Sequence, residues 1–177
     1  MLADESKAVS ACLTGWALST ATNVPLLETC SAPKGPLIGT VAFLGGLGEL
    51  TRQGKLSSDV AGYILAALLI PVSLQEIAAP QATLDAFGLP KPSTLTKSLF
   101  ENFSFTKMST GLFLLVGKLT GKRGLGLAAS AGGQLLNTVK TITRADDVGL
   151  NKPALCVWSG IQAVVALLAY KNEMAEA

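Results

Sequence analysis

Six long runs without a charged residue constrain this chain more than any other feature of its sequence. A helix needs about 20 apolar residues to cross the hydrocarbon core of a bilayer. Only 15% of the residues are charged and 49% are hydrophobic, whereas soluble globular domains have about 25% charged residues. We therefore predict an all-α fold, a multi-pass membrane helical bundle of three to six helices, with residues 1–177 forming a single helical membrane domain. The runs cover residues 8–27, 35–48, 60–75, 108–117, 124–139 and 153–170.

Two of these runs are the clearest candidate membrane spans. The run at 153–170 begins with Pro153, and proline is favourable in a first helical turn because its missing N–H has no partner to lose there. It ends at Tyr170, an amphipathic aromatic residue suited to a membrane–water interface. The run at 60–75 contains Pro71, which removes one helix hydrogen bond. We expect Pro71 to kink or end that helix.

Proline also limits the other parts of the chain. Pro25 lies near the end of the run at 8–27, so we expect the first helix to cover about Ala8–Asn23, either spanning the membrane or lying in its interface. The longest connection, residues 77–106, contains three prolines. Its amphipathic part at 96–105 fits either an interfacial helix or a loop packed on a neighbour.

A short internal similarity indicates two helical hairpins. Residues 48–54 read Gly-Glu-Leu-Thr-Arg-Gln-Gly, and residues 117–124 read Gly-Lys-Leu-Thr-Gly-Lys-Arg-Gly. Each segment lies between two apolar runs, so each predicts a tight glycine-containing turn with basic residues. The positive-inside rule then places both turns on one side of the membrane, facing the cytosol, stroma or matrix.

Small residues recur at four-residue intervals in the fifth run. Gly124, Ala128 and Gly132 would form one smooth stripe on a helix, and small side chains let two helices approach closely in lipid. The stripe predicts packing within the chain or a docking face for another subunit. Ser159 and Ala163 of the last run are the candidate facing groove.

The residue types exclude most catalytic machinery. The chain has no histidine, which removes the commonest general base and metal ligand, and we predict no catalytic or metal-binding residues. Glu49 and Glu76 could together hold a metal, but we interpret each as marking the end of a membrane segment at the water interface. Cys12, Cys30 and Cys156 are interpreted as buried apolar residues, with a Cys12–Cys30 disulfide as the alternative.

Five amide side chains in or near the runs are the candidate cofactor-binding residues. In lipid such amides usually hydrogen-bond between helices. An amide oxygen also suits magnesium, a hard cation that prefers oxygen ligands, so a protein without histidine can still bind chlorophyll. The light-harvesting patterns Glu-x-x-His-x-Arg and Glu-x-x-Asn-x-Arg are absent, which excludes a standard antenna protein. The candidates are Gln75, Asn102, Gln134, Asn137 and Gln162.

These observations predict a non-catalytic accessory subunit at the periphery of a large bioenergetic membrane complex. A photosystem or light-harvesting supercomplex of the plastid thylakoid is the first choice, with chlorophyll and carotenoid as cofactors. A respiratory or ATP synthase accessory subunit of the mitochondrial inner membrane is the second. Partners would be other membrane subunits and lipids, and the net charge of +2 gives no reason to expect nucleic acid. The alternative is a small transporter, channel or membrane enzyme, favoured by the hairpin repeat and disfavoured by the uncharged centres of the runs.

Overall fold

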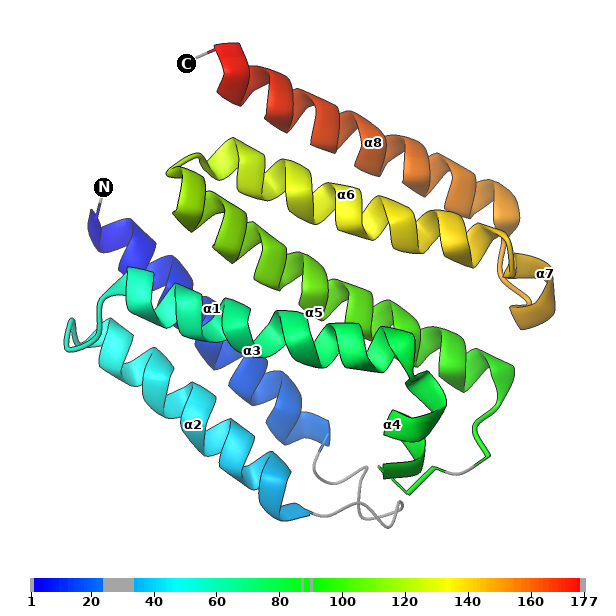
Figure 1. The fold of residues 1–177 in the computed structure, drawn as a ribbon, viewed down its shortest axis with the longest axis horizontal. Coiled ribbons are helices and arrows are strands. Elements are labelled where there is room, and N and C mark those ends of the chain that lie inside the picture. Colours follow the sequence, from blue (N-terminus) through cyan, green and yellow to red (C-terminus); the bar gives the residue numbers. More distant parts are fainter. Residues whose placement is uncertain (1, 24–33, 87, 90, 176–177) are drawn as a thin grey trace. The chain divides into compact units, whose positions relative to one another are not determined.

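The computed structural model is all-helical in the part it describes, which comprises residues 2–23, 34–86, 88–89 and 91–175. Helix accounts for 88% of the structure, and this part contains no strand. The all-α prediction is therefore confirmed. In chain order the helices are α1 (Leu2–Asn23), α2 (Lys34–Arg52), α3 (Ser58–Ala78), α4 (Pro80–Ala86), α5 (Thr94–Thr120), α6 (Arg123–Ile142), α7 (Ala145–Val148) and α8 (Lys152–Ala175) (Figure 1).

The chain divides into two compact units. The first comprises Met1–Leu65 and Ala82–Lys91, and the second comprises Ala66–Gln81 and Pro92–Ala177. Helices α3 and α4 contribute residues to both units. We describe each unit by itself, and the single membrane domain over residues 1–177 stays a prediction.

In the first unit, α2 packs along α1 and not along α3. The absence of a side chain at Gly48 permits this approach, because a Cβ there would lie 2.9 Å from Oγ1 of Thr14. The Ser10 hydroxyl donates to the Gly48 carbonyl at 2.9 Å. The first predicted hairpin is therefore wrong as a packed pair of helices, although its turn exists and contains Gly54 with a φ of 71°. The core between the two helices includes Val9, Leu13, Ala17 and Leu44.

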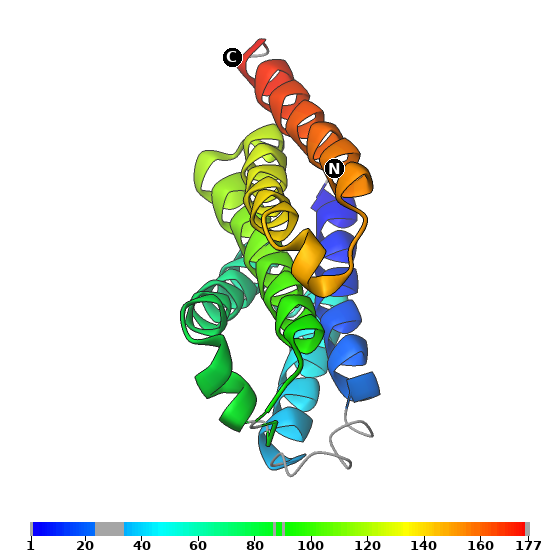
Figure 2. The same cartoon turned by 90° about the vertical axis from the view of Figure 1, so that its right-hand side faces the viewer.

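In the second unit, α5, α6 and α8 lie side by side, with successive helices antiparallel and α6 in the middle (Figures 1 and 2). Helix α5 begins after Ser93, whose side chain accepts the Thr96 N–H at 3.0 Å. It ends at Thr120 and is followed by Gly121, where φ is 68°, a left-handed conformation that glycine adopts without steric cost. The second predicted hairpin is thus confirmed as α5, a glycine turn and α6.

Of the two prolines expected to limit helices, Pro25 and Pro71, only Pro25 is followed by the predicted result that a helix ends just before it. Helix α1 ends at Asn23 as expected but begins at Leu2 and not near Ala8, while Pro25 itself lies outside the described residues. Helix α3 continues through Pro71 to Ala78, so the prediction that Pro71 could end the helix is wrong. The amphipathic part at 96–105 is the first half of the 27-residue helix α5, because Ser93 caps the helix after the last proline.

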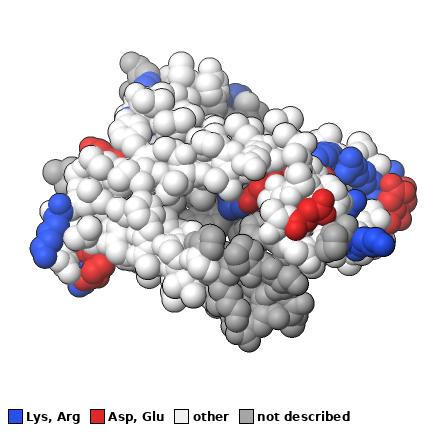
Figure 3. Space-filling model, turned by 60° about the horizontal axis from the view of Figure 1, so that its bottom comes forward, with Lys and Arg blue, Asp and Glu red and all other residues white. Residues whose placement is uncertain are grey.

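Two helices are long and apolar enough to cross a membrane, by length and composition. They are α3 and α8, the two clearest candidates in the sequence, with 39% and 11% of their apolar windows buried. Uncharged surface covers most of the face drawn in Figure 3, and charged residues gather in small groups. A bundle with more than two membrane passes remains a proposal.

Candidate functional site

Three of the five candidate amides join α5 to α6. The Asn137 Nδ2 group of α6 donates to Asn102 Oδ1 of α5 at 2.5 Å. Asn102 in turn donates to the Ser98 carbonyl at 3.0 Å. One turn of α6 away, Gln134 donates to the Thr106 hydroxyl at 3.2 Å. These contacts support hydrogen bonding between helices as the role of the three amides.

The other two amides differ sharply in their surroundings. Gln162 of α8 is only 8% exposed, and its Oε1 accepts the hydroxyl hydrogen of Thr138 at 2.8 Å, which ties α8 to α6. Gln75 lies exposed near the end of α3. Among the described residues, no hydrogen-bond partner is found for its side chain. The structure therefore brings four candidates into one polar layer and leaves Gln75 apart.

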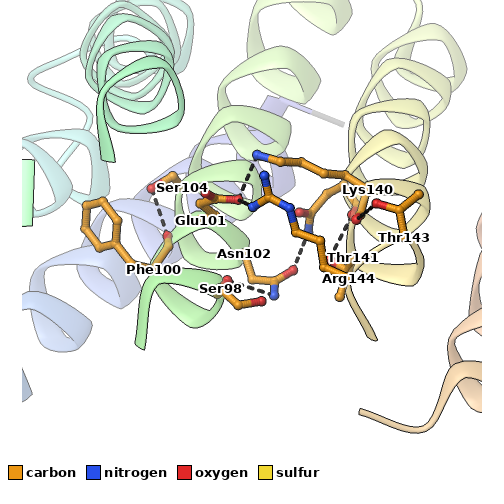
Figure 4. A network of polar contacts seen from close by, with 10 residues as sticks. Ser98, Phe100, Glu101, Asn102, Ser104, Lys140, Thr141, Thr143 and Arg144 are labelled. Atoms are coloured by element: carbon orange, nitrogen blue, oxygen red, sulfur yellow. Dashed lines mark hydrogen bonds and ion pairs between the residues drawn. The ribbon is translucent and has the colours of Figure 1, made fainter. Parts of the chain in front are cut away.

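An ion cluster extends the polar layer at the end of the α5–α6 pair. The Glu101 carboxylate lies 2.7 Å from Lys140 Nζ and 3.5 Å from Arg144 Nη1. Its side chain is 13% exposed, whereas that of Arg144 is 56% exposed. Figure 4 shows Lys140 of α6 and Arg144, just after α6, both pointing toward Glu101 of α5. One partly buried carboxylate thus has two cationic partners.

A second, more deeply buried ion pair joins the end of α3 to the middle of α5. Glu76 is 4% exposed, and its carboxylate accepts hydrogen bonds from Lys107 Nζ at 2.5 Å and from the Ser104 hydroxyl at 2.7 Å. The ammonium group of Lys107 also lies 5.0 Å from the centre of the Phe103 ring. The interpretation of Glu76 as a marker of the water interface is therefore wrong, because pairing with Lys107 offsets its desolvation.

Sequence reasoning missed these ion pairs because the charges lie outside the uncharged runs. A usable signal exists at the end of α6 and just after it, where Asn137, Lys140, Thr141 and Arg144 recur at helical spacing. In α5, Ser104 and Lys107 are likewise three residues apart. Polar residues with this period on otherwise apolar helices predict a polar seam between them.

Glu49 differs from Glu76 because it is exposed at the end of α2. Arg52 donates to its carboxylate through Nε at 2.7 Å and Nη2 at 2.6 Å. The hydrogen bonds from Arg52 and Gln53 lower the pKa of Glu49 to about 2. In the described part of the chain, no three His, Cys, Asp or Glu residues lie together as a metal site.

The cysteines only partly follow the expectation that they are buried. Cys12 is partly buried and Cys156 is exposed, and both are free thiols. The buried interpretation is therefore wrong for Cys156, which lies on the outer side of α8. Cys30, and with it the alternative Cys12–Cys30 disulfide, lies outside the described residues.

The predicted small-residue stripe is in close contact with α8 at Gly124 but not with any neighbour at Gly132. The Gly124 N–H donates to the Glu173 carboxylate at 2.6 Å, and a Cβ on Gly124 would lie 2.8 Å from the Ala169 carbonyl. A Cβ on Gly132 would meet no atom within 4 Å. The prediction that the stripe as a whole faces a closely packed helix is wrong.

Two other glycines make the close approach between α6 and α5. A Cβ on Gly126 would lie 2.6 Å from the Phe113 carbonyl, and one on Gly133 would lie 3.0 Å from the Ser109 hydroxyl. These glycines are seven residues apart and therefore share a helix face. The same face of α6 includes the buried Asn137, so the glycines that face α5 lie on the same side of the helix as the polar contacts.

Helix α8 presents small and polar residues to α6 and bulky apolar residues outward. Ser159 lies on the inner side as expected, but Ala163 is exposed, so the predicted groove is half correct. On the outer side Val157 is 66% exposed. The partly or fully buried stripe is Leu155, Ser159, Gln162, Ala166, Ala169 and Glu173, and the exposed residues include Val157, Trp158, Ile161, Val164 and Leu168.

Comparisons with models of known families, with curated proteins and with solved structures find no match for this chain. The function is therefore inferred from geometry and chemistry. Four amides are engaged in hydrogen bonds that hold helices together, and the charged groups of the same layer are engaged in ion pairs. This arrangement is suited to fixing helices in a defined register, whereas Gln75 and the outer side of α8 are exposed.

Proposed function

We propose that this chain is a membrane-embedded subunit that works by binding neighbouring proteins and lipid, and not by catalysis. The observation that carries the proposal is the arrangement of α8. A helix on the surface of a water-soluble protein turns its apolar side inward, whereas α8 turns Gln162 inward and Val157, Ile161 and Val164 outward. Such a surface needs lipid or another apolar helix against it.

The complex we propose first is a photosystem or light-harvesting supercomplex in the thylakoid, and the second is a mitochondrial respiratory or ATP synthase complex. The side-chain oxygens of Asn102 and Gln162 already accept hydrogen bonds, and the side chains of Asn137 and Gln134 are held in place by the hydrogen bonds that their NH2 groups donate. Gln75 is exposed and is not held in this way, so it is the side chain we propose for a chlorophyll magnesium. Carotenoid, which has no need of a ligand atom, would bind on the apolar surface of α3 or α8.

Purification from membranes in a mild detergent tests the proposal. We expect the chain to require detergent for extraction and to elute with defined partner chains at a mass well above its own 18.2 kDa. A Val164→Asn variant on the outer side of α8 should lose those partners. The matched Leu136→Asn variant, at a position of α6 that is 67% exposed against 55% for Val164, should keep them. Release without detergent, or equal retention of partners by both variants, would contradict the proposal.

An absorption spectrum of the same material separates the versions of the complex. Chlorophyll bands that fall in a Gln75→Leu variant and persist in a Gln134→Leu variant would support pigment binding at Gln75. A complex without pigment that contains respiratory or ATP synthase subunits would support the mitochondrial version. A pigment-free complex of neither type would remove both organelle assignments and leave only the membrane subunit.

A small transporter or channel is the second candidate, because the Glu76–Lys107 pair places buried charges between helices. Ionisable residues in such positions commonly serve ion or proton pathways. Ion or proton flux into liposomes containing only this chain, lost in a Glu76→Gln variant, would favour the transporter. Tight liposomes at the same protein density would favour the binding subunit.

A further inference from the structure

We propose that one flank of the α5–α6 pair is the surface on which a second copy of this chain docks, through a symmetric pair of Gln134 side chains. The inference rests on the proposed membrane location and names one partner of the proposed subunit. The surface, which we call the polar flank, consists of Thr106 and Thr110 of α5 and Ser130 and Gln134 of α6.

The polar flank is joined by the hydrogen bond from Gln134 to the Thr106 hydroxyl, which is 3.2 Å long and lies at the exposed surface. Thr110 follows Thr106 by four residues, and Ser130 precedes Gln134 by four residues. Residues four apart lie on the same face of a helix, so the four side chains share one side of the helix pair. Thr106 is exposed and the other three are partly exposed.

Apolar side chains border the polar flank. On α5, Leu99 and Phe103 precede Thr106 by seven and three residues, which places them on the same face. On α6, Leu127 precedes Gln134 by seven residues and shares its face in the same way. All three apolar side chains are exposed, at 59%, 42% and 44%. A small polar area thus lies within an apolar surface.

The polar flank lies at half the height of its helices. Thr106 and Gln134 are near the middle of α5 and α6. Thr138, four residues after Gln134, bonds to Gln162 near the middle of α8. If α8 crosses the bilayer, this level lies in the hydrocarbon core. A polar group exposed there has no water to bond with, which is costly.

The opposite flank of α6 is apolar. Leu136 follows Gln134 by two residues and therefore lies about 200° further around the helix. It is 67% exposed, and Val139, on the same side, is 49% exposed. Lipid tails are sufficient to cover that flank. The two flanks of one helix therefore differ in what they require from their surroundings.

A second copy supplies what the Gln134 amide requires. An amide has two N–H donors and an oxygen that accepts twice. In the part of the chain that the structure describes, the bond to Thr106 is the hydrogen bond found for this side chain, and it uses one donor. Two copies related by a two-fold axis place the same group on both sides, so each amide can donate to the oxygen of the other. The small side chains of Ser130 and Thr106 let the helices approach closely.

Cross-linking in membranes tests this docking. The variant Ser130→Cys, in a background of Cys12→Ala, Cys30→Ala and Cys156→Ala, is treated with a short thiol-specific bifunctional reagent. We expect a covalent dimer at twice the 18.2 kDa mass of the chain. The matched variant Leu136→Cys, on the opposite flank of α6, should stay monomeric under the same treatment.

Sedimentation in mild detergent measures the dimer without cross-linking and with all native cysteines present. We expect Gln134→Leu to raise the dimer dissociation constant roughly tenfold, the size expected for two hydrogen bonds between helices in a membrane. The matched control is Gln75→Leu, because Gln75 is also an exposed glutamine but lies on α3. It should change the dissociation constant by less than about twofold.

Four outcomes would overturn the inference. These are a native chain that stays monomeric in both measurements, equal cross-linking from positions 130 and 136, equal effects of Gln134→Leu and Gln75→Leu, and a cross-link from position 130 to a different chain only. The last outcome would assign the polar flank to another subunit.

The proposed function can fail separately from this inference. Extraction of the chain without detergent would contradict membrane embedding before any cross-link is formed. A chain that requires detergent and elutes with other subunits, but does not pair with its own copy, would contradict only the docking at the polar flank.

Discussion

Helices α5 and α6 are held together in two different ways along their length. Near their connecting turn, which we call the turn half (residues 109–120 and 123–133), glycines bring the two backbones close together. Toward the other end, the open half (residues 94–107 and 134–144), amides and ion pairs join the helices. Where α6 faces α5 in the turn half, there is no room for an additional atom at Gly126. The open half depends on each polar partner, as Glu101 shows.

This difference shows two ways in which a chain with few charges can hold two helices together. Close backbone contact relies on dispersion between many atoms and on shape, which small residues provide. Hydrogen bonds and ion pairs rely on specific partners, and they become costly when one partner is lost in a buried place. Substitutions should therefore act in opposite senses in the two halves: enlargement harms the turn half, and deletion harms the open half.

The largest effect is expected from Lys107→Met, which lies in the α5 part of the open half and pairs with Glu76 of α3. The substitution keeps much of the side-chain volume but leaves the buried Glu76 carboxylate without its cation, so we expect a loss of about 3–5 kcal/mol in the free energy of unfolding. Unfolding in mixed detergent micelles, followed by circular dichroism, would measure it. The double variant Lys107→Met with Glu76→Leu should recover most of the loss. A loss below about 1 kcal/mol for Lys107→Met alone would mean that the pair contributes little.

A smaller effect is expected from Gly126→Ala in the turn half. The new methyl group would lie 2.6 Å from the Phe113 carbonyl oxygen, so one helix must move, at about 2 kcal/mol. The matched control is Gly132→Ala, whose methyl group meets no atom within 4 Å. That control should be neutral or stabilising by about 0.5 kcal/mol, because alanine is the better helix former. Equal effects of the two substitutions would remove the turn half as a distinct mode of packing.

The amide pair of the open half should show a coupling energy of about 1 kcal/mol. Unfolding of Asn102→Ala, Asn137→Ala and the double variant would measure it, because the double-mutant cycle isolates the interaction of the two side chains. The pair Gln75→Ala and Asn137→Ala should show no coupling. Coupling near zero for Asn102 and Asn137 would mean that their hydrogen bond adds no stability.

The smallest effect is expected from Ser109→Ala, at the boundary between the two halves. Ser109 is 2% exposed, and its hydroxyl is the buried side-chain atom without a hydrogen-bond partner in the described part of the chain. The alanine variant no longer buries a hydroxyl group that lacks a hydrogen-bond partner. We therefore expect the free energy of unfolding to rise by about 0.5 kcal/mol. Thr138→Val, which deletes a hydroxyl bonded to Gln162, should instead be destabilising. A loss of stability in Ser109→Ala would show that the hydroxyl has a partner after all.

The sequence predicts the helices well because uncharged runs, caps and glycine turns are local signals. The ends of α1 at Asn23 and of α5 just before Gly121 follow from such signals. Which face of a helix meets a neighbour is not local, because the rotation of a helix about its axis depends on all its contacts. Gly124, Ala128 and Gly132 form a small stripe in the sequence, but it is Gly126 and Gly133, on the same side of α6 as Asn137, that face α5.

The same limit applies to the candidate site. The amides are visible in the sequence, and their preference for partners in lipid is general chemistry. Their actual partners, such as Thr138 for Gln162, come from helices whose order in space the sequence does not specify. Glu76 shows this most clearly, since its partner Lys107 is 31 residues away.

The two attachments of α8 to α6 have a consequence for the side of α8 that faces outward. The bond of Gln162 to Thr138 and that of Glu173 to Gly124 are 11 residues apart in α8, roughly 16 Å along its axis. A single hydrogen bond would let α8 change its angle relative to α6. Two hydrogen bonds at different heights prevent both a change of angle and a translation of α8 along α6. The rotation of helix α8 about its axis is therefore fixed. The same side chains always face outward, in a constant arrangement that a neighbouring helix can recognise.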